Sequence, residues 1–113
     1  MVTNLDFLKT FTKGDSAKMK KYIEMYLDTA KQKMDVMNQA LTNNDFESLK
    51  VAAHTMKSQA RYMGITTVEA SIVSIEHACS EQQNLAQLPN LVNEVCDILS
   101  QSAIELSETI KSL

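Results

Sequence analysis

The side chain best suited to chemistry in this sequence is His54. A neutral imidazole has one ring nitrogen with a free lone pair, and that nitrogen can act as a nucleophile. Lys50, Lys57 and Arg61 stand at positions minus four, plus three and plus seven from it, so a helix would gather all four side chains on one face. A histidine among three cations predicts a site for an anion, such as a phosphoryl group carried on the ring.

These cations differ in how they could serve such a site. Lys57 is one helical turn from His54 on the same side, so we expect it to contact the added negative charge. Lys50 and Arg61 lie farther away and are better placed to attract an acidic partner surface. The small side chain of Ser58 leaves space beside the ring, where a bulky side chain would block an approaching protein.

A histidine nucleophile also needs a hydrogen bond at its second ring nitrogen, because that bond selects the tautomer. If the helices on either side of Ile65 form a hairpin, facing positions sum to about 130 and residue 76 lies opposite His54. That residue is Glu76, whose carboxylate can accept the bond. The sequence therefore predicts a contact between His54 and Glu76.

Plainer interpretations exist for each of these residues. A single helical histidine beside lysines is most often a solvated surface residue, and Glu76 alone would be one more exposed carboxylate. His77 points away from the apolar side of its helix and receives no role. Zinc binding by His54, His77 and Cys79 would need side chains that point in different directions, so no metal site is expected.

Helix-ending and helix-capping residues divide the chain into five helical segments. Gly and Pro are scarce, but Gly14 and Gly64 are each suited to the position after a helix. Asp15 or Ser16 can cap the second segment, and Asp45 is a good N-cap residue for the third. The expected helices span about 4–11, 16–42, 46–63, 66–80 and 89–110.

Apolar residues recur every three or four positions along these segments, which gives each helix one buried face. In the short first segment that face carries Leu5, Leu8 and Phe11. Thr66 and Glu69 form a possible capping box at the start of the fourth. Short connections favour antiparallel neighbours, so the predicted fold is all-α: an up-down-up-down four-helix bundle with a short additional N-terminal helix. The seven methionines lie mostly on these apolar faces and are interpreted as packing residues, and both cysteines, Cys79 and Cys96, are interpreted as core.

Bulk composition limits the function further. A chain of 113 residues fits one domain, residues 1–113. A net charge of -3 makes nucleic acid an unexpected ligand. Neither a basic leader nor a long apolar run is present, so we expect a cytoplasmic protein that does not enter the membrane. The sequence contains no nucleotide-binding motif, so neither autonomous kinase activity nor an intrinsic cofactor is expected.

The run from Ala53 to Gly64, AHTMKSQARYMG, resembles the signature of histidine-containing phosphotransfer (HPt) domains, usually His-x-Leu-Lys-Gly followed by small residues and a Gly. Similar landmarks extend the resemblance over about residues 3–99. They are Leu5–Leu8, Gly14–Asp15, Ala40–Phe46 and Ile75–Ala78. The chain departs from the family pattern at Met56, Ser58, Gln59 and Arg61, which leaves open which partners dock here.

The resemblance implies that His54 is phosphorylated, with Lys57 as charge partner and Glu76 as hydrogen-bond partner. It implies as partners the receiver domains of response regulators and of hybrid sensor histidine kinases, with the catalytic magnesium bound by the receiver. The leading hypothesis is a relay that passes a phosphoryl group between receivers through His54. The alternatives are a catalytically silent receiver-docking module and a purely structural bundle.

Docking also requires apolar surface near His54. The hairpin that turns near Asn43 places Met34 level with the histidine. We expect Met34, Met37 and Val51 to form an exposed apolar patch there, with burial of both methionines as the equally weighted alternative. The expected partner-binding residues are Lys50, Val51, Ser58, Gln59, Arg61 and Met34. A bundle with satisfied apolar faces has no need to dimerise, so a monomer is expected.

Overall fold

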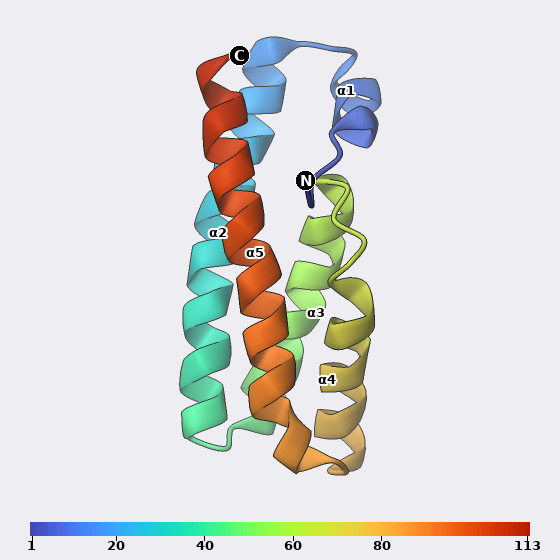
Figure 1. Ribbon diagram of the computed structural model, residues 1–113, viewed down its shortest axis with the longest axis vertical. Helices are drawn as coiled ribbons and strands as arrows, with labels where there is room; N and C mark the ends of the chain where they lie inside the picture. The colour runs from blue at the N-terminus through green and yellow to red at the C-terminus, as the bar shows by residue number, and fades with distance from the viewer.

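A computed structural model describes residues 1–113, which form five α-helices and one short 3-10 helix. The elements are α1 (Asp6–Thr12), α2 (Ser16–Thr42), α3 (Phe46–Tyr62), α4 (Glu69–Glu81), η1 (Leu85–Gln87) and α5 (Leu88–Lys111). The four long helices form an antiparallel bundle that measures 44 × 21 × 20 Å, and α1 packs at one side of it (Figure 1). The predicted all-α, up-down-up-down architecture with a short extra N-terminal helix is confirmed.

Each long helix packs against two others, in the cyclic order α2, α3, α4, α5. The seam between α3 and α4 therefore lies on the opposite side of the bundle from the seam between α2 and α5 (Figure 1). This arrangement separates His54, which is on α3, from the α2–α5 side.

The core consists of one cluster of apolar side chains drawn from every helix. Apolar spacing predicts a buried stripe on α3. Its first member, Phe46, is half-buried, and the others are buried: Leu49, Ala53, Met56, Ala60 and Met63. Ala53 and Met56, on either side of His54, are both fully buried. Cys79 is buried and Cys96 is half-buried, and both are free thiols. Burial raises the pKa of both thiols, as expected of cysteines that act as packing residues.

Aspartate caps begin the two helices that lead to the site. The Asp15 carboxylate accepts a hydrogen bond from the backbone N–H of Lys18 at 3.1 Å, and Asp45 accepts one from Ser48 at 3.1 Å. Each bond satisfies a backbone donor that the first helical turn leaves unpaired. The predicted cap Asp45 is confirmed, and of the two candidates for α2 the cap is Asp15, with Ser16 as the first helical residue.

The predicted capping box at α4 is wrong. Val68 is the N-cap residue of α4, with helical φ and ψ of -89° and -17° and no side-chain capping bond. The Glu69 carboxylate pairs with Arg61 of α3 instead of turning back toward Thr66. A charged partner across the hairpin thus outcompetes the local backbone bond.

The apolar spacing predicts an inner face of α5 made of Leu91, Val95, Ile98, Ser102, Leu106 and Ile110. The observed face is rotated slightly from it. Leu91 and Ile98 are half-buried, whereas Val92 and Leu99, one position on from each, are fully buried. Ser102 is buried as part of this face, and Tyr26 and Ser102 share a hydrogen bond of 2.8 Å across the α2–α5 seam. Since the Ser102 hydroxyl donates to the Leu99 carbonyl at 2.6 Å, the Tyr26 hydroxyl must donate to Ser102.

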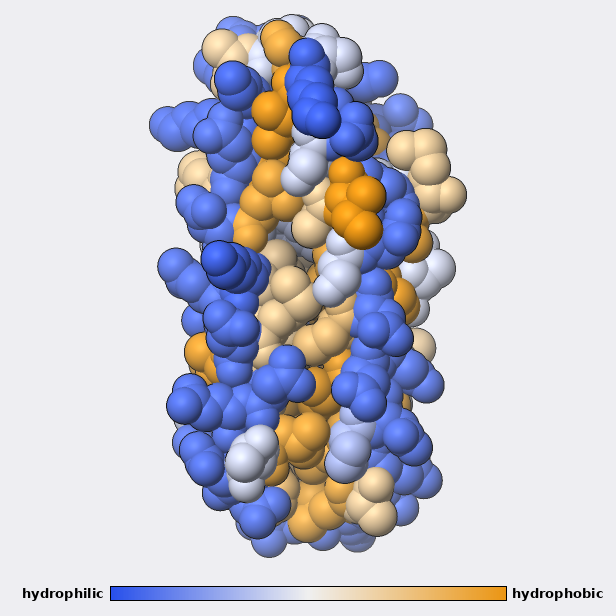
Figure 2. Space-filling model, turned by 60° about the vertical axis from the view of Figure 1, so that its left-hand side comes forward, coloured by the Kyte–Doolittle hydropathy of each residue, from blue (hydrophilic) through white to orange (hydrophobic).

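The α2–α5 side of the molecule carries a lengthwise apolar strip between hydrophilic margins (Figure 2). Met34 of α2 belongs to this seam, because its sulfur lies 3.8 Å from the Ser100 hydroxyl of α5. Cys96 of α5 likewise lies 3.8 Å from the Asn38 amide of α2. Both side chains are half-buried and pack on the core.

Candidate functional site

His54 is held on the outer edge of the α3–α4 seam. Its side chain is 64% exposed, while the backbone that carries it is anchored by the buried Ala53 and Met56. Its Nδ1 atom lies 2.8 Å from Oε2 of Glu76 on α4. The contact predicted from the hairpin register is therefore confirmed, and the ring is both accessible and restrained.

Glu76 bridges His54 and Lys57. Its second oxygen, Oε1, accepts a hydrogen bond from the Lys57 ammonium at 2.8 Å, and the Lys57 and Glu76 side chains are only 19% and 18% exposed. Partial burial raises the pKa of Glu76, but the bonds from Lys57 and His54 outweigh it, and the net pKa lies below the usual value. Glu76 is therefore a carboxylate at neutral pH.

The carboxylate determines which nitrogen of His54 is reactive. A carboxylate can only accept hydrogen bonds, so Nδ1 must carry the ring proton. In a neutral ring this leaves the lone pair on Nε2, on the side turned away from Glu76. The site therefore presents one nucleophilic nitrogen to solvent, while the Lys57 ammonium keeps two of its three donors for another acceptor.

The other two predicted cations have different environments. Lys50 is half-buried and shares a shallow hollow with Val51, His54, Thr55 and Glu76. Arg61 donates from Nε to Glu69 at 2.7 Å, which ties its guanidinium to the first turn of α4. Lys50 is thus beside the histidine, whereas Arg61 lies beyond it along α3.

A family model of the Hpt domain matches residues 21–106. This chain belongs to the Hpt domain family. The family predicted from the sequence is confirmed, and with it a phosphotransfer role in two-component signalling. HPt domains interact with receiver domains and kinases in phosphorelays, which defines the classes of partner to consider.

Two solved structures share the fold of this HPt domain. The HPT domain of the Hpt sensor hybrid histidine kinase from Shewanella is 21% identical, with a TM-score of 0.83. Histidine-containing phosphotransfer protein B from Pseudomonas aeruginosa is 13% identical, with a TM-score of 0.88. Each comparison covers 99% of this chain and 96% of the other. No curated protein sequence matches the chain.

The predicted apolar patch of the HPt domain is only partly correct. Val51 is 53% exposed beside His54, as expected. Met37 is fully buried, and Met34 is half-buried in the α2–α5 seam on the other side of the bundle. The hairpin register sets how far along the bundle Met34 lies, but the rotation of α2 turns its side chain toward α5.

An aromatic surface that the sequence analysis missed lies further along α3. We call Phe7, Phe11, Tyr22 and Tyr62 the aromatic patch. These side chains are between 36% and 55% exposed. The Phe7 ring centroid is 6.2 Å from that of Phe11 and 5.6 Å from that of Tyr62, and Phe11 is 5.5 Å from Tyr22.

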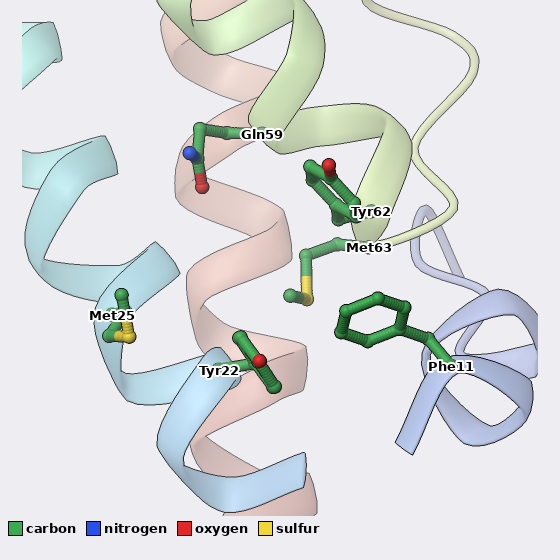
Figure 3. Close-up of a pocket in the computed structure, with 6 residues that line it drawn as sticks. All are labelled: Phe11, Tyr22, Met25, Gln59, Tyr62 and Met63. Atoms are coloured by element: carbon green, nitrogen blue, oxygen red, sulfur yellow. The ribbon is translucent and has the colours of Figure 1, made fainter. Parts of the chain in front are cut away.

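Helices α1, α2 and α3 each contribute to this patch. Figure 3 shows Phe11, Tyr22 and Tyr62 around a hollow that is also lined by Met25, Gln59 and Met63. Phe11 was predicted to be buried, but the helix α1 is so short that only Leu8 and Thr12 become buried in it. The pair of phenylalanines four residues apart at positions 7 and 11 was the signal available in the sequence.

The patch is continuous with the histidine site. His54, Ser58 and Tyr62 succeed one another at four-residue intervals on one side of α3. Ser58 is exposed and lines a second hollow with Phe7, Arg61 and Tyr62. A partner that covers His54 could therefore reach the aromatic patch without crossing a bulky side chain.

The structure contains neither a cluster of metal-ligating side chains nor a helix that could cross a membrane. The structure brings together no group of three or more His, Cys, Asp and Glu side chains that could hold a metal ion. His77 is exposed on α4 and Cys79 is buried, so they do not converge with His54. None of the helices has both the length and the apolar character needed to span a bilayer.

Proposed function

We propose that this HPt domain accepts a phosphoryl group on Nε2 of His54 from a receiver-domain aspartate, or from a histidine kinase, and passes it to the receiver of another response regulator. The observation that carries the proposal is the 2.8 Å contact between Nδ1 of an exposed His54 and Glu76. That contact leaves Nε2 as the accessible nucleophile.

The transfer step balances without any other reactant. The Nε2 lone pair attacks the phosphorus of the aspartyl phosphate, an N–P bond forms, and the bond from phosphorus to the aspartate oxygen breaks. The aspartate leaves as a carboxylate. Nδ1 keeps its proton throughout, and the adjacent Glu76 carboxylate stabilises the positive charge that the ring acquires.

Lys57 would stabilise the phosphorylated form. A phosphoryl group brings a charge approaching about -2. A cation about 4 Å away gains at most about 4 kcal/mol per unit charge, and solvent near an exposed ring reduces this severalfold. The Lys57 ammonium can contact the phosphoryl oxygens with a free donor while it keeps its bond to Glu76.

The partner would supply the rest of the machinery. The receiver would supply the aspartate that donates or accepts the phosphoryl group, and magnesium bound by the receiver would act as the Lewis acid, so the HPt domain would need no intrinsic cofactor. Lys50, Val51, Ser58, Gln59 and Arg61 would form the surface that the receiver covers around His54. The aromatic patch takes the place of the methionines, Met34 included, as the apolar part of that surface.

A transfer assay tests the proposal. A receiver labelled with radioactive phosphate is mixed with wild type, with His54→Gln, and with Glu108→Gln as a matched surface control. Label that is acid-labile and base-stable on wild type and the control, but absent from His54→Gln, is the expected result. Tight receiver binding without label on any variant would instead identify a silent docking module.

A further inference from the structure

The segment that precedes α1 is clamped by a single carboxylate on α5. Glu105 accepts the backbone N–H of Val2 at 2.9 Å and that of Thr3 at 3.1 Å. It also accepts the Thr3 hydroxyl at 2.9 Å. The Val2 N–H is the largest cause that lowers the pKa of Glu105, which falls from 4.5 to about 2. The clamp is therefore ionised throughout the physiological range.

The next residue of the segment is locked against the α3–α4 turn. The backbone N–H of Asn4 donates to the Met63 carbonyl at 3.0 Å. Gly64 has a φ of +68°, and a Cβ there would lie 2.0 Å from the Asn4 carbonyl oxygen. The Asn4 side chain then accepts the backbone N–H of Asp6 at 2.9 Å, at the first residue of α1. The segment 2–4 thus connects α5 to the start of α1.

Helix α1 has little else to hold it in place. It spans seven residues, which is too short for a helix to be stable by itself. Leu8 is its one fully buried apolar side chain, while Phe7 and Phe11 project into the aromatic patch. The position of the two phenylalanines therefore depends on how the two ends of α1 are tied to the bundle.

We propose that Glu105 is a positioning residue for partner docking: by clamping Val2 and Thr3, it holds α1 so that Phe7 and Phe11 complete the apolar part of the receiver-binding surface. Glu105 acts from α5, the helix diagonally across the bundle from α3. This inference rests on the proposed function, because it assigns the aromatic patch to the receiver. It extends that function to a residue distant from the histidine and outside the family motif.

The test compares Glu105→Ala with Glu105→Gln and with the control Glu108→Ala, which removes an exposed carboxylate bonded only to Lys111. We expect Glu105→Ala to weaken binding of the unphosphorylated protein to its receiver about threefold to tenfold. Glu105→Gln, which keeps an acceptor oxygen, should recover part of the loss, and Glu108→Ala should bind like wild type. Amide hydrogen exchange in α1 should accelerate in Glu105→Ala, with α3 unchanged.

A double-mutant cycle separates positioning from a general loss of stability. In a Phe7→Ala/Phe11→Ala background, Glu105→Ala should weaken binding no further, because the side chains that it positions are gone. An equal loss in both backgrounds, or unchanged exchange in α1, would overturn the inference.

Phosphorylation of His54 by phosphoramidate, a donor that needs no docking surface, should be the same in all Glu105 variants. If the wild-type protein neither binds a receiver nor accepts label from one, the proposed function itself is wrong. If wild type transfers normally and Glu105→Ala binds the receiver as tightly as wild type, only the proposed role of Glu105 is wrong.

Discussion

Polar groups meet across both opposite seams of this bundle, but in different ways. Between α3 and α4, His54, Glu76 and Lys57 form a charged network at the surface, with the histidine ring mostly exposed. Between α2 and α5, Tyr26 and Ser102 form a neutral pair that is fully buried. The packing of the two helix pairs is otherwise alike, since each joins antiparallel helices through apolar stripes.

The difference depends on where a polar residue stands relative to the stripe. His54 directly follows the buried Ala53, which places it about 100° around α3 and at the rim of the seam. Tyr26 and Ser102 are members of their stripes, so their hydroxyls are buried and must satisfy each other. A shift of one position along a helix therefore decides whether a polar side chain lies at the exposed rim, where it can react, or in the core, where its role is structural.

The largest expected effect is at the surface network. His54→Gln should abolish phosphoryl transfer, because no other side chain offers a nucleophilic nitrogen at this position. Its free energy of unfolding should stay within about 0.5 kcal/mol of wild type, since the ring is exposed. Transfer assays and urea denaturation measure the two quantities, and residual transfer would place the phosphoryl group on another residue.

Substitutions in the buried pair of Tyr26 and Ser102 should lower stability and leave phosphoryl transfer unchanged. Ser102→Ala leaves the Tyr26 hydroxyl buried without a partner and should lower the free energy of unfolding by about 1 to 3 kcal/mol. Tyr26→Phe leaves Ser102 bonded to the Leu99 carbonyl and should cost less, about 1 kcal/mol. Transfer rates below the unfolding transition should match wild type in both, and a large change in rate would show that the two seams are coupled.

Lys57→Ala should slow transfer from a phosphorylated receiver about tenfold, equal to ~1.4 kcal/mol in the transition state. The same variant removes a hydrogen bond from Glu76, so the pKa of Glu76 should rise toward its usual value. Rapid-quench kinetics measure the first effect. Lys50→Ala removes another cation of the receiver-binding surface and should slow transfer less, and equal slowing by both variants would mean that only the general positive charge matters.

Within the network of His54, Lys57 and Glu76, substitution of Glu76 should have the smallest effect on transfer rate and the clearest spectroscopic signature. Glu76→Ala should slow transfer about threefold, because the ring then samples both tautomers, while Glu76→Gln should retain the Nδ1–H tautomer. Nitrogen chemical shifts of the imidazole distinguish the two tautomers. An unchanged tautomer ratio in Glu76→Ala would exclude Glu76 as the group that orients the ring.

The pH dependence of stability gives a further test of the same network. The pKa of Glu76 is lowered in the folded protein, so its contribution to stability is fully present above its usual pKa of 4.5. That contribution is lost as the pH falls from there through the lower folded pKa. Wild type should therefore lose more stability than Glu76→Gln between neutral pH and this acidic range, as measured by denaturation at each pH. An equal loss of stability in both proteins would contradict the lowered pKa of Glu76.

Much of the site could be predicted from the sequence because its determinants are local or depend on one short hairpin. The apolar spacing shows which face of α3 is buried, and therefore that His54 lies at its edge. The short connection around Ile65 sets how α3 and α4 face each other, which brought Glu76 to His54. The family motif, the bundle and the two aspartate caps follow from signals of the same kind.

Only the tertiary structure decided the features that involve a third helix or distant residues. Whether Met34 faces α3 or α5 depends on the rotation of α2 among all its neighbours, which no periodicity encodes. Glu105 on α5 binds Val2, which lies more than a hundred residues away in the sequence. Local patterns determine which side of a helix is buried, whereas contacts between distant segments exist only once the chain has packed.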